Sequence, residues 1–394
     1  MLYSPRFLDI KDIIFNIGEK MMKRLILFFF LMSFHGFLFA DLIDVYKKGE
    51  IKIVPDSEFG KNMDWDLLLY KGIRSISFTP DGSFFVSGKG LHKIFKFDSN
   101  GNLIKSFGKR GQGPGDFIYP RCLSILDDKY LVVGEYPLNR RISLFDLSGK
   151  FIKLITTNYF PFDSFALENN KIAILSNKTS NANEKFLITH HTIFINDLIT
   201  GKDIEVTSFD EKRANVTRGG GIVIVPGTYY GRVCFVKIDN TKFLVGFSDT
   251  PDISIYSIDG IKLSSFKVEF ERRKVTGDMK KRFIKMVEEE GPNKSSNFMK
   301  NLKQVIFPEY TPYYSEIKVD SDHNILVYKW KGEKKIEDAT FQVYSKDGQF
   351  ICETKIESEN FEPAYPSVFY KNYAYYILKS KGNDGFSLER VELK

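Results

Sequence analysis

The chain has 394 residues, of which 43% are hydrophobic and 15% aromatic, enough to bury the core of one large domain or of several smaller ones. Its formal net charge of +7 comes from 57 basic and 50 acidic residues, and no long basic run marks a surface for nucleic acid or for a membrane. We therefore expect no nucleic-acid partner. The three cysteines, Cys122, Cys234 and Cys352, lack the spacing of a metal site, so we interpret them as buried apolar residues.

The first 40 residues predict export. Met22-Lys23-Arg24 precedes an apolar stretch that ends at Ala40, which is the pattern of a signal peptide over residues 21–40. The stretch is shorter than the about 20 residues that span a bilayer, so we expect no stable membrane span after cleavage. Residues 1–20 do not resemble a signal, and we interpret them as an artefact upstream of the true start or as a disordered extension. The alternative is an uncleaved N-terminal membrane anchor.

From residue 41 onward a hairpin recurs, in which Asp or Ser opens a turn and glycine supplies the positive φ that the reversal needs. The steps between successive turn glycines are 48, 52, 59 and 88 residues (149 − 101, 201 − 149, 260 − 201 and 348 − 260). The first two match the roughly 40–50 residues of a four-stranded propeller blade. A further hairpin precedes each copy, so each unit is a meander of strands A, B, C and D. The turn glycines are Gly101, Gly149, Gly201, Gly260 and Gly348.

The tail of the chain supplies only three strands, at 368–370, 373–378 and 386–393. The segment 51–54, near the predicted mature N-terminus, can supply the fourth and close the ring, which removes two exposed sheet edges. We therefore predict an all-β fold, a six-bladed β-propeller of four-stranded antiparallel blades, as a single domain over residues 41–394. A pair of β-sandwich domains is the alternative, and it explains the regular spacing less well.

The clearest unit runs from residue 111 to 152. It contains Gly111-Gln112-Gly113-Pro114-Gly115-Asp116-Phe117, Pro120, Leu131-Val132-Val133, Arg141-Ile142, Phe145-Asp146 and Gly149-Lys150-Phe151. This run resembles an NHL-type repeat, and the whole chain resembles exported six-bladed propeller proteins of bacteria. The resemblance implies a periplasmic or secreted location. It also implies an alternative function, because such propellers include a peptide-amidating lyase and lactone hydrolases with a metal, Ca or Zn, at the central channel.

In a meander the B–C and D–A links lie on one side of the ring, and we call this side the elaborated face. Its long segments are predicted at 109–120, 177–190, 209–230 and 271–312, and ligands usually bind where loops are elaborated on a rigid scaffold. Segment 271–312 carries the one good helical pattern, with Met279, Phe283, Met286 and Val287 on a single stripe. We predict a short helical insertion that either crosses the channel mouth or covers an apolar blade edge.

Catalytic motifs are absent, including HExxH, GxSxG and a P-loop. The adjacent His190 and His191 would face opposite sides of a strand, which makes them a poor joint metal site. The glycine-rich segment 111–115 has no helix after it and contains Pro114, so it is a poor phosphate-binding loop.

The remaining candidates are arginines, tyrosines and one glutamate in or beside the links. Arginine and tyrosine are favoured at recognition sites. Each also fits an ordinary solvated loop position. Our leading hypothesis is an exported, monomeric, non-enzymatic propeller without a cofactor, which binds a protein, peptide or glycan there. A third possibility is a scaffold with no small ligand. The candidate residues are Arg110, Arg121, Glu135, Tyr136, Arg140, Arg141, Tyr229, Tyr230, Arg232, Tyr310, Tyr313 and Tyr314.

Overall fold

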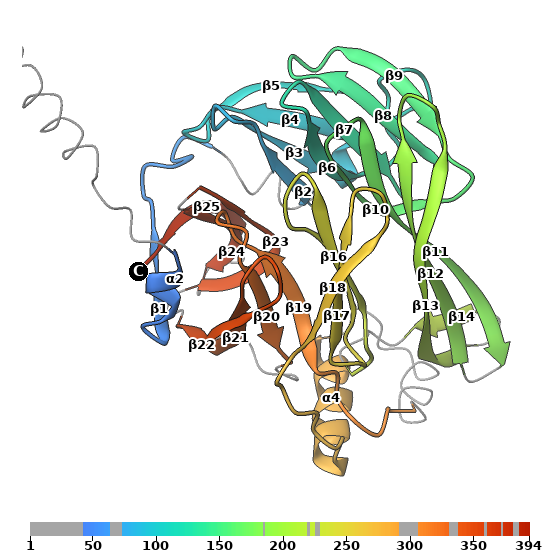
Figure 1. The fold of residues 1–394 in the computed structure, drawn as a ribbon, viewed down its shortest axis with the longest axis vertical. Helices are drawn as coiled ribbons and strands as arrows, with labels where there is room; N and C mark the ends of the chain where they lie inside the picture. Colours follow the sequence, from blue (N-terminus) through green and yellow to red (C-terminus); the bar gives the residue numbers. More distant parts are fainter. Residues whose placement is uncertain are drawn as a thin grey trace, which may run out of the picture. The chain divides into compact units, whose positions relative to one another are not determined.

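The computed structural model describes residues 42–63, 73–183, 186–218, 221–224, 229–290, 306–330, 338–357, 361–371, 373–380 and 386–394 (Figure 1). The chain divides into two compact units, residues 1–44 and residues 45–394. Almost all of the first unit, including the predicted signal segment, lies outside the described residues, so the description concerns the second. None of the helices in the described part is long and apolar enough to cross a membrane.

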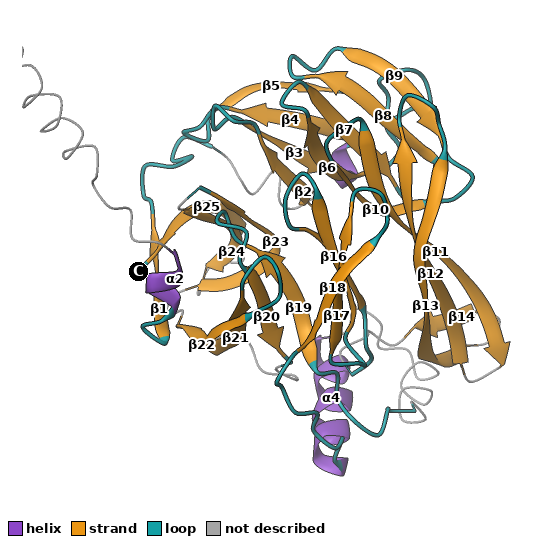
Figure 2. Ribbon diagram, in the orientation of Figure 1, coloured by secondary structure: helices purple, strands orange, loops and turns teal. Residues whose placement is uncertain are grey.

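The second unit is built from β-sheets, and in blades 1 to 4 each sheet is antiparallel and formed by strands that are consecutive in sequence (Figures 1 and 2). Blades 1, 2 and 4 have four strands each, and blade 3 has a fifth strand at its edge. Their strands are, for blade 1, β2 (Ile73–Phe78), β3 (Phe84–Gly88), β4 (Lys93–Phe97) and β5 (Leu103–Phe107); for blade 2, β6 (Pro120–Leu126), β7 (Tyr130–Glu135), β8 (Arg141–Asp146) and β9 (Phe151–Thr156); for blade 3, β10 (Pro161–Ala166), β11 (Lys171–Asn183), β12 (Phe186–Asp197), β13 (Asp203–Arg218) and β14 (Gly221–Ile224); for blade 4, β15 (Val233–Lys237), β16 (Lys242–Phe247), β17 (Asp252–Ser257) and β18 (Lys262–Lys267).

Blades 5 and 6 share one eight-stranded sheet because the N-terminal strand β1 (Glu50–Pro55) pairs with both. Ile53 of β1 lies opposite Leu393 in antiparallel register, and Glu50 lies opposite Lys355 in parallel register. The prediction that an N-terminal strand completes the last blade is therefore confirmed. The strands are, for blade 5, β19 (Tyr314–Val319), β20 (Ile325–Lys329), β21 (Asp338–Tyr344) and β22 (Phe350–Glu357); and, for blade 6, β23 (Phe361–Tyr370), β24 (Tyr373–Ser380) and β25 (Phe386–Leu393).

The turn glycines behave as the repeat predicts. All five adopt positive φ, between 69° at Gly201 and 90° at Gly348. In blade 2 the backbone N–H of Gly149 donates to the carbonyl of Asp146 (2.9 Å), and the Asp146 carboxylate accepts from the Ser148 hydroxyl (2.6 Å) and from the Lys150 N–H (2.9 Å). The Ser148 and Lys150 hydrogen bonds lower the pKa of Asp146. Local turn chemistry therefore fixes each C–D reversal.

The core lies between neighbouring blades rather than inside one layer. Phe85 of blade 1 packs with Leu131 and Phe145 of blade 2, and Phe243 of blade 4 packs in one cluster with Ile195 of blade 3. Similar clusters join blades 2 and 3, blades 4 and 5, and blades 6 and 1. The abundant aromatic side chains that the composition shows are used at these seams.

On the side opposite the elaborated face, lysines of one blade reach the C–D turn of the next. Lys96 donates to the carbonyl of Leu147 (3.0 Å), Lys153 donates to that of Leu198 (3.0 Å), and Lys242 pairs with Asp347 (3.0 Å). These contacts run from blade 1 to 2, from 2 to 3 and from 4 to 5. These seams are thus held together by polar contacts at one side in addition to the apolar packing at their centre.

Two of the predicted links are wrong. Residues 177–190 are not a loop, because β11 and β12 continue through them apart from residues 184 and 185, and the segment from Phe209 is strand as far as Arg218. The three long strands are visible as one ribbon in Figure 1. Beyond the blade core β11 and β13 are mostly polar in sequence, at 177–183 and 210–213, so they lack the apolar alternation that identifies a strand.

The predicted helical insertion is present as α4 (Gly277–Glu290). The fully buried Phe283 of this helix packs with Tyr229, Val275 and Trp330. Two short helical segments complete the described elements, α2 (Leu42–Tyr46) and a single 3-10 turn, η1 (Lys89–Leu91).

Candidate functional site

The glycine-rich link into blade 2 is held by one buried ion pair. Arg141 donates through Nε to Glu135 (2.5 Å) and through Nη1 and Nη2 to the carbonyls of Gln112 (2.6 Å) and Asp116 (2.8 Å). The other Glu135 oxygen accepts from the Ile118 N–H (2.8 Å). Glu135 is fully buried and Arg141 nearly so. These two candidate residues are therefore occupied in ordering the link and do not face solvent.

Beside this link, arginines stack on aromatic rings. The Arg121 guanidinium lies over Phe162 (4.3 Å) and Tyr136 (5.5 Å), and that of Arg140 lies over Phe160 (4.6 Å). Arg121 and the three rings are half-buried, whereas Arg140 is exposed. Arg110, also exposed, lies at the entry to the link, where its backbone bridges to Phe117. Sequence reasoning found the arginines and Tyr136 but missed both phenylalanines, which read as core residues.

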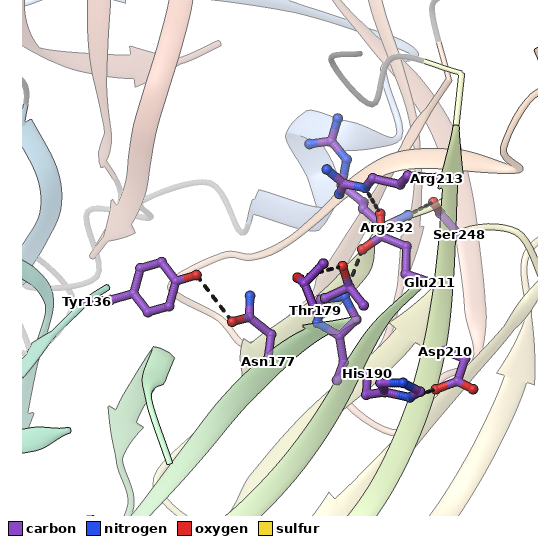
Figure 3. Close-up of polar contacts among 11 residues, drawn as sticks. Tyr136, Asn177, Thr179, His190, Asp210, Glu211, Arg213, Arg232 and Ser248 are labelled. Carbon is purple, nitrogen blue, oxygen red and sulfur yellow. Dashed lines mark hydrogen bonds and ion pairs between the residues drawn. The ribbon is translucent and has the colours of Figure 1, made fainter. Parts of the chain in front are cut away.

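The extended ribbon of blade 3 carries two acid–histidine pairs on opposite faces, and Figure 3 shows one of them, His190 with Asp210. His190 Nδ1 lies 2.6 Å from Asp210 at the surface, and His191 Nε2 lies 2.7 Å from Glu211 in the interior. The expectation that the adjacent histidines face opposite ways is confirmed. Burial acts to raise the pKa of Glu211, but the hydrogen bond from His191 and the charge of Arg213 outweigh it, so the pKa lies below its usual range.

Blades 2, 3 and 4 meet around this ribbon. The Tyr136 hydroxyl donates to the Asn177 side chain (3.3 Å), as Figure 3 shows. On the other side, the Arg232 N–H donates to Ser248 Oγ (3.0 Å), and the Arg232 side chain is exposed. Burial raises the pKa of Asp249, the residue after Ser248, and the nearby charge of Glu211 adds to this effect. Asp249 therefore lies in a buried setting near a second acidic group.

A third arginine stack stands where the chain leaves and re-enters the helical insertion. Arg272 lies over Tyr313 (5.4 Å) and Tyr310 (5.6 Å), and its Nε donates to the Thr311 carbonyl (2.7 Å). Its Nη2 also lies 3.6 Å from an Asp249 oxygen. Tyr310 is 40% exposed, so the stack presents an aromatic edge to solvent. Arg272 was not among the sequence candidates, although the run from Glu271 to Lys274 is the signal that could have found it.

The remaining tyrosines of the candidate set are structural in their contacts. The buried Tyr229 donates to the carbonyl of Met279 in α4 (3.3 Å), and the buried Tyr230 donates to that of Ile306. Tyr314 is fully buried, and its hydroxyl has no hydrogen-bond partner in the described part of the chain. Burial raises the pKa of Tyr314 well above its usual value. These rings hold the insertion and the seam between blades 4 and 5.

Within the described residues, no three histidines, cysteines or acidic side chains lie together as metal ligands. Cys122 and Asp163 come closest to a reactive pair, with Sγ 3.3 Å from Oδ1 on adjacent inner strands. Burial raises the pKa of both groups, and the charge of Arg121 opposes that rise. A thiol kept protonated in this way is a poor nucleophile.

This architecture is that of a six-bladed β-propeller with arginine stacks at two of its seams, between blades 2 and 3 and between blades 4 and 5. Residues 65–307 match the family DUF5128, described as a 6-bladed beta-propeller, and the chain belongs to that family. The family is thus a propeller family, as the sequence predicts, whereas the finer likeness to NHL repeats stays a prediction. No curated protein sequence matches the chain.

Solved structures similar to the chain are remote. A member of the DUF4221 family from Bacteroides vulgatus is 11% identical with a TM-score of 0.47, over 87% of this chain and 96% of that one. Virginiamycin B lyase from Staphylococcus aureus is 11% identical with a TM-score of 0.42, over 87% and 98%. BamB from Moraxella catarrhalis is 10% identical with a TM-score of 0.37, over 86% and 98%. No function passes from them to this chain at that distance.

Proposed function

We propose that this chain is an exported propeller that binds a macromolecular ligand, a protein, peptide or glycan, on its elaborated face. The observation that supports it is a set of three arginine stacks. Arg121 on Phe162 and Arg140 on Phe160 lie between blades 2 and 3, and Arg272 on Tyr313 lies between blades 4 and 5. The guanidinium groups of Arg121 and Arg140 donate no hydrogen bond within the described residues, and stacking fixes their orientation, so less side-chain entropy is lost when a ligand binds. The Arg272 guanidinium, by contrast, already donates to backbone carbonyls and pairs with Asp249.

Charge at this face favours an anionic group on the ligand. Glu135 is paired with Arg141, Glu211 is paired with His191 and Arg213, and Asp249 has a raised pKa and lies beside Arg272. The carboxylates of Glu135, Glu211 and Asp249 are therefore already engaged. Arg140 and Arg232 make no ion pair within the described residues and are exposed. A carboxylate or sulfate is the natural complement of such guanidinium groups.

Binding to three probes tests the proposal with the full chain: polygalacturonate, dextran and poly-L-glutamate, an acidic glycan, a neutral glycan and an acidic polypeptide. We expect an acidic probe to bind, more weakly at high salt. Arg140→Ala should weaken it about tenfold, the loss of one charged hydrogen bond. Lys262→Ala, an exposed residue on the outer strand β18, is the matched control and should change nothing. No binding to any probe, or equal binding by the Arg140 variant, contradicts the proposal.

The alternative that the resemblance implies, a lyase or lactone hydrolase, depends on a metal. The described part of the chain offers no set of three histidine, cysteine or acidic side chains for it. Elemental analysis of the purified protein separates the two readings. Stoichiometric Ca or Zn would favour the enzyme, whereas binding that persists in a metal-free preparation would favour the recognition role. Export itself is tested by fractionation and by sequencing of the mature N-terminus, which we expect near Asp41.

A further inference from the structure

The outer strand of blade 3 is exceptional for its length. β13 has 16 residues, whereas the outer strands of blades 1, 2 and 4 have 5, 6 and 6. Only its last four residues, 215–218, are covered, by β14. Within the described residues, the outer edge of residues 203–214 therefore pairs with nothing. Natural proteins normally keep edge strands short or blocked, because an open edge is a template for another strand.

The register tells which groups this edge offers. Arg218 lies opposite Gly221 across a two-residue connection, so that pair closes the hairpin with hydrogen bonds. Bonding direction alternates along an antiparallel strand. The N–H and C=O groups of Ser208, Asp210 and Lys212 therefore point outward, away from β12, as those of Val216 point to β14. The chain itself thus shows that this edge accepts an antiparallel strand.

We propose that a second copy of this chain occupies the edge, with the two β13 strands antiparallel across a two-fold axis. This pairing needs a self-complementary sequence, and β13 has one. With Phe209 on the axis, opposite Phe209 of the second copy, Ser208 lies opposite Asp210, and both present outward hydrogen-bonding groups. Aromatic cross-strand pairs of this kind are among the favourable ones.

The charges of β13 fit the same arrangement. Glu205 is exposed and makes no ion pair within the described residues, and the antiparallel register brings it beside Lys212 and Arg213 of the second copy. The Lys212 ammonium now lies over the Phe186 ring (4.1 Å) and is exposed. A parallel pairing would instead place like charges together, which is unfavourable. The proposed dimer differs from the monomer that the sequence suggests. Its contact involves none of the stacked arginines, so it is independent of the proposed function.

Sedimentation equilibrium on the full chain tests the proposal. The wild type should form a dimer whose dissociation depends on concentration. Ser208→Pro removes one outward N–H and no bond to β12, a position where an edge strand tolerates proline. It should weaken the dimer at least about tenfold, while Ser208→Ala, the matched control, should stay within about twofold of wild type. A wild type that remains monomeric, even one that binds another polypeptide at this edge, overturns the proposal, as does a proline variant that dimerises normally.

Charge reversal supplies a second test that does not depend on the folding of the proline variant. Glu205→Lys and Lys212→Glu should each weaken the dimer, and the two together should restore it, because the antiparallel pair is then rebuilt with its signs exchanged. Single variants without effect, or a double variant as weak as the singles, would contradict the antiparallel register.

Discussion

Blades 2 and 3 are neighbours with the same four-strand meander, yet each is elaborated in a different way. Blade 2 is short and buries its one strong ion pair, Glu135 with Arg141, to shape a loop. Blade 3 extends its strands to as many as 16 residues and carries its acid–histidine pairs on a ribbon outside the blade core. The comparison teaches that one repeat can be specialised either through its links or through the length of its strands.

The largest expected effect contrasts the two buried glutamates. Glu135→Ala leaves the buried Arg141 guanidinium without its partner and should cost about 3–5 kcal/mol in the free energy of unfolding. Glu211→Ala should cost about 1–3 kcal/mol, because Arg213 is 32% exposed and can turn to water. Chemical denaturation measures both, and replacing Glu135 and Arg141 together by apolar residues should recover part of the loss. Equal losses of unfolding free energy in Glu135→Ala and Glu211→Ala would contradict this difference between the two glutamates.

A buried acid that has no cationic partner in the described part of the chain gives a third case to compare with the two paired glutamates. Asp320 in blade 5 accepts from Tyr46 (3.0 Å) and from Asn324 (2.9 Å), and burial raises its pKa to about 6. Between about pH 4 and 6 the folded protein holds a proton that the unfolded chain has lost, so stability should fall as pH rises through this window. The fall should be at most about 3 kcal/mol.

Thermal unfolding of the wild type and of Asp320→Asn, a neutral replacement, from pH 4 to 7 measures this slope. The variant should lack the part of the slope that Asp320 causes, while Asp322→Asn, in the same turn, should keep it. Identical pH profiles for wild type and Asp320→Asn would show that the carboxyl is ionised throughout.

The C–D turns of the two blades offer a smaller contrast. A methyl group on Gly149 would lie 2.7 Å from the Phe107 ring of blade 1, whereas one on Gly201 would meet nothing within 4 Å. Both glycines have positive φ, which costs an alanine about 1–2 kcal/mol. Gly149→Ala should therefore destabilise by about 1 kcal/mol more than Gly201→Ala, owing to the overlap. Denaturation midpoints measure the difference, and a larger loss at Gly201 would argue against the tight seam between blades 1 and 2.

The smallest effect distinguishes the two faces of the ribbon. His190→Gln should change stability by less than about 0.5 kcal/mol, because the pair with Asp210 is exposed. His191→Gln should cost about 1–2 kcal/mol, since the buried Glu211 loses a donor. Both variants can be followed by the same thermal melt. If His190→Gln lowered the stability more than His191→Gln, the assignment of the exposed and buried faces of the ribbon would be wrong.

Much of the fold could be predicted because its signals are local. A C–D turn depends on about five consecutive residues, such as Asp146 to Lys150, so glycine spacing revealed the blades, their meander and the need for a closing strand. The helix at 277–290 could likewise be predicted from one apolar stripe. Of the candidate residues, Arg121 and Arg140 lie beside links as the sequence predicts, whereas Arg272 was missed.

Other features depended on tertiary structure, because their causes lie in other blades. Polar strands such as β11 to β13 look like loops until a neighbour pairs with them, so the ribbon and its open edge were hidden. Glu135 and Arg141 looked like surface ligands until burial and the carbonyls of the preceding link occupied them. The rings that support Arg121 and Arg140 belong to the strand that begins the next blade and to the link before it. Sequence determined where the chain turns, and packing between blades decided which side chains remain exposed.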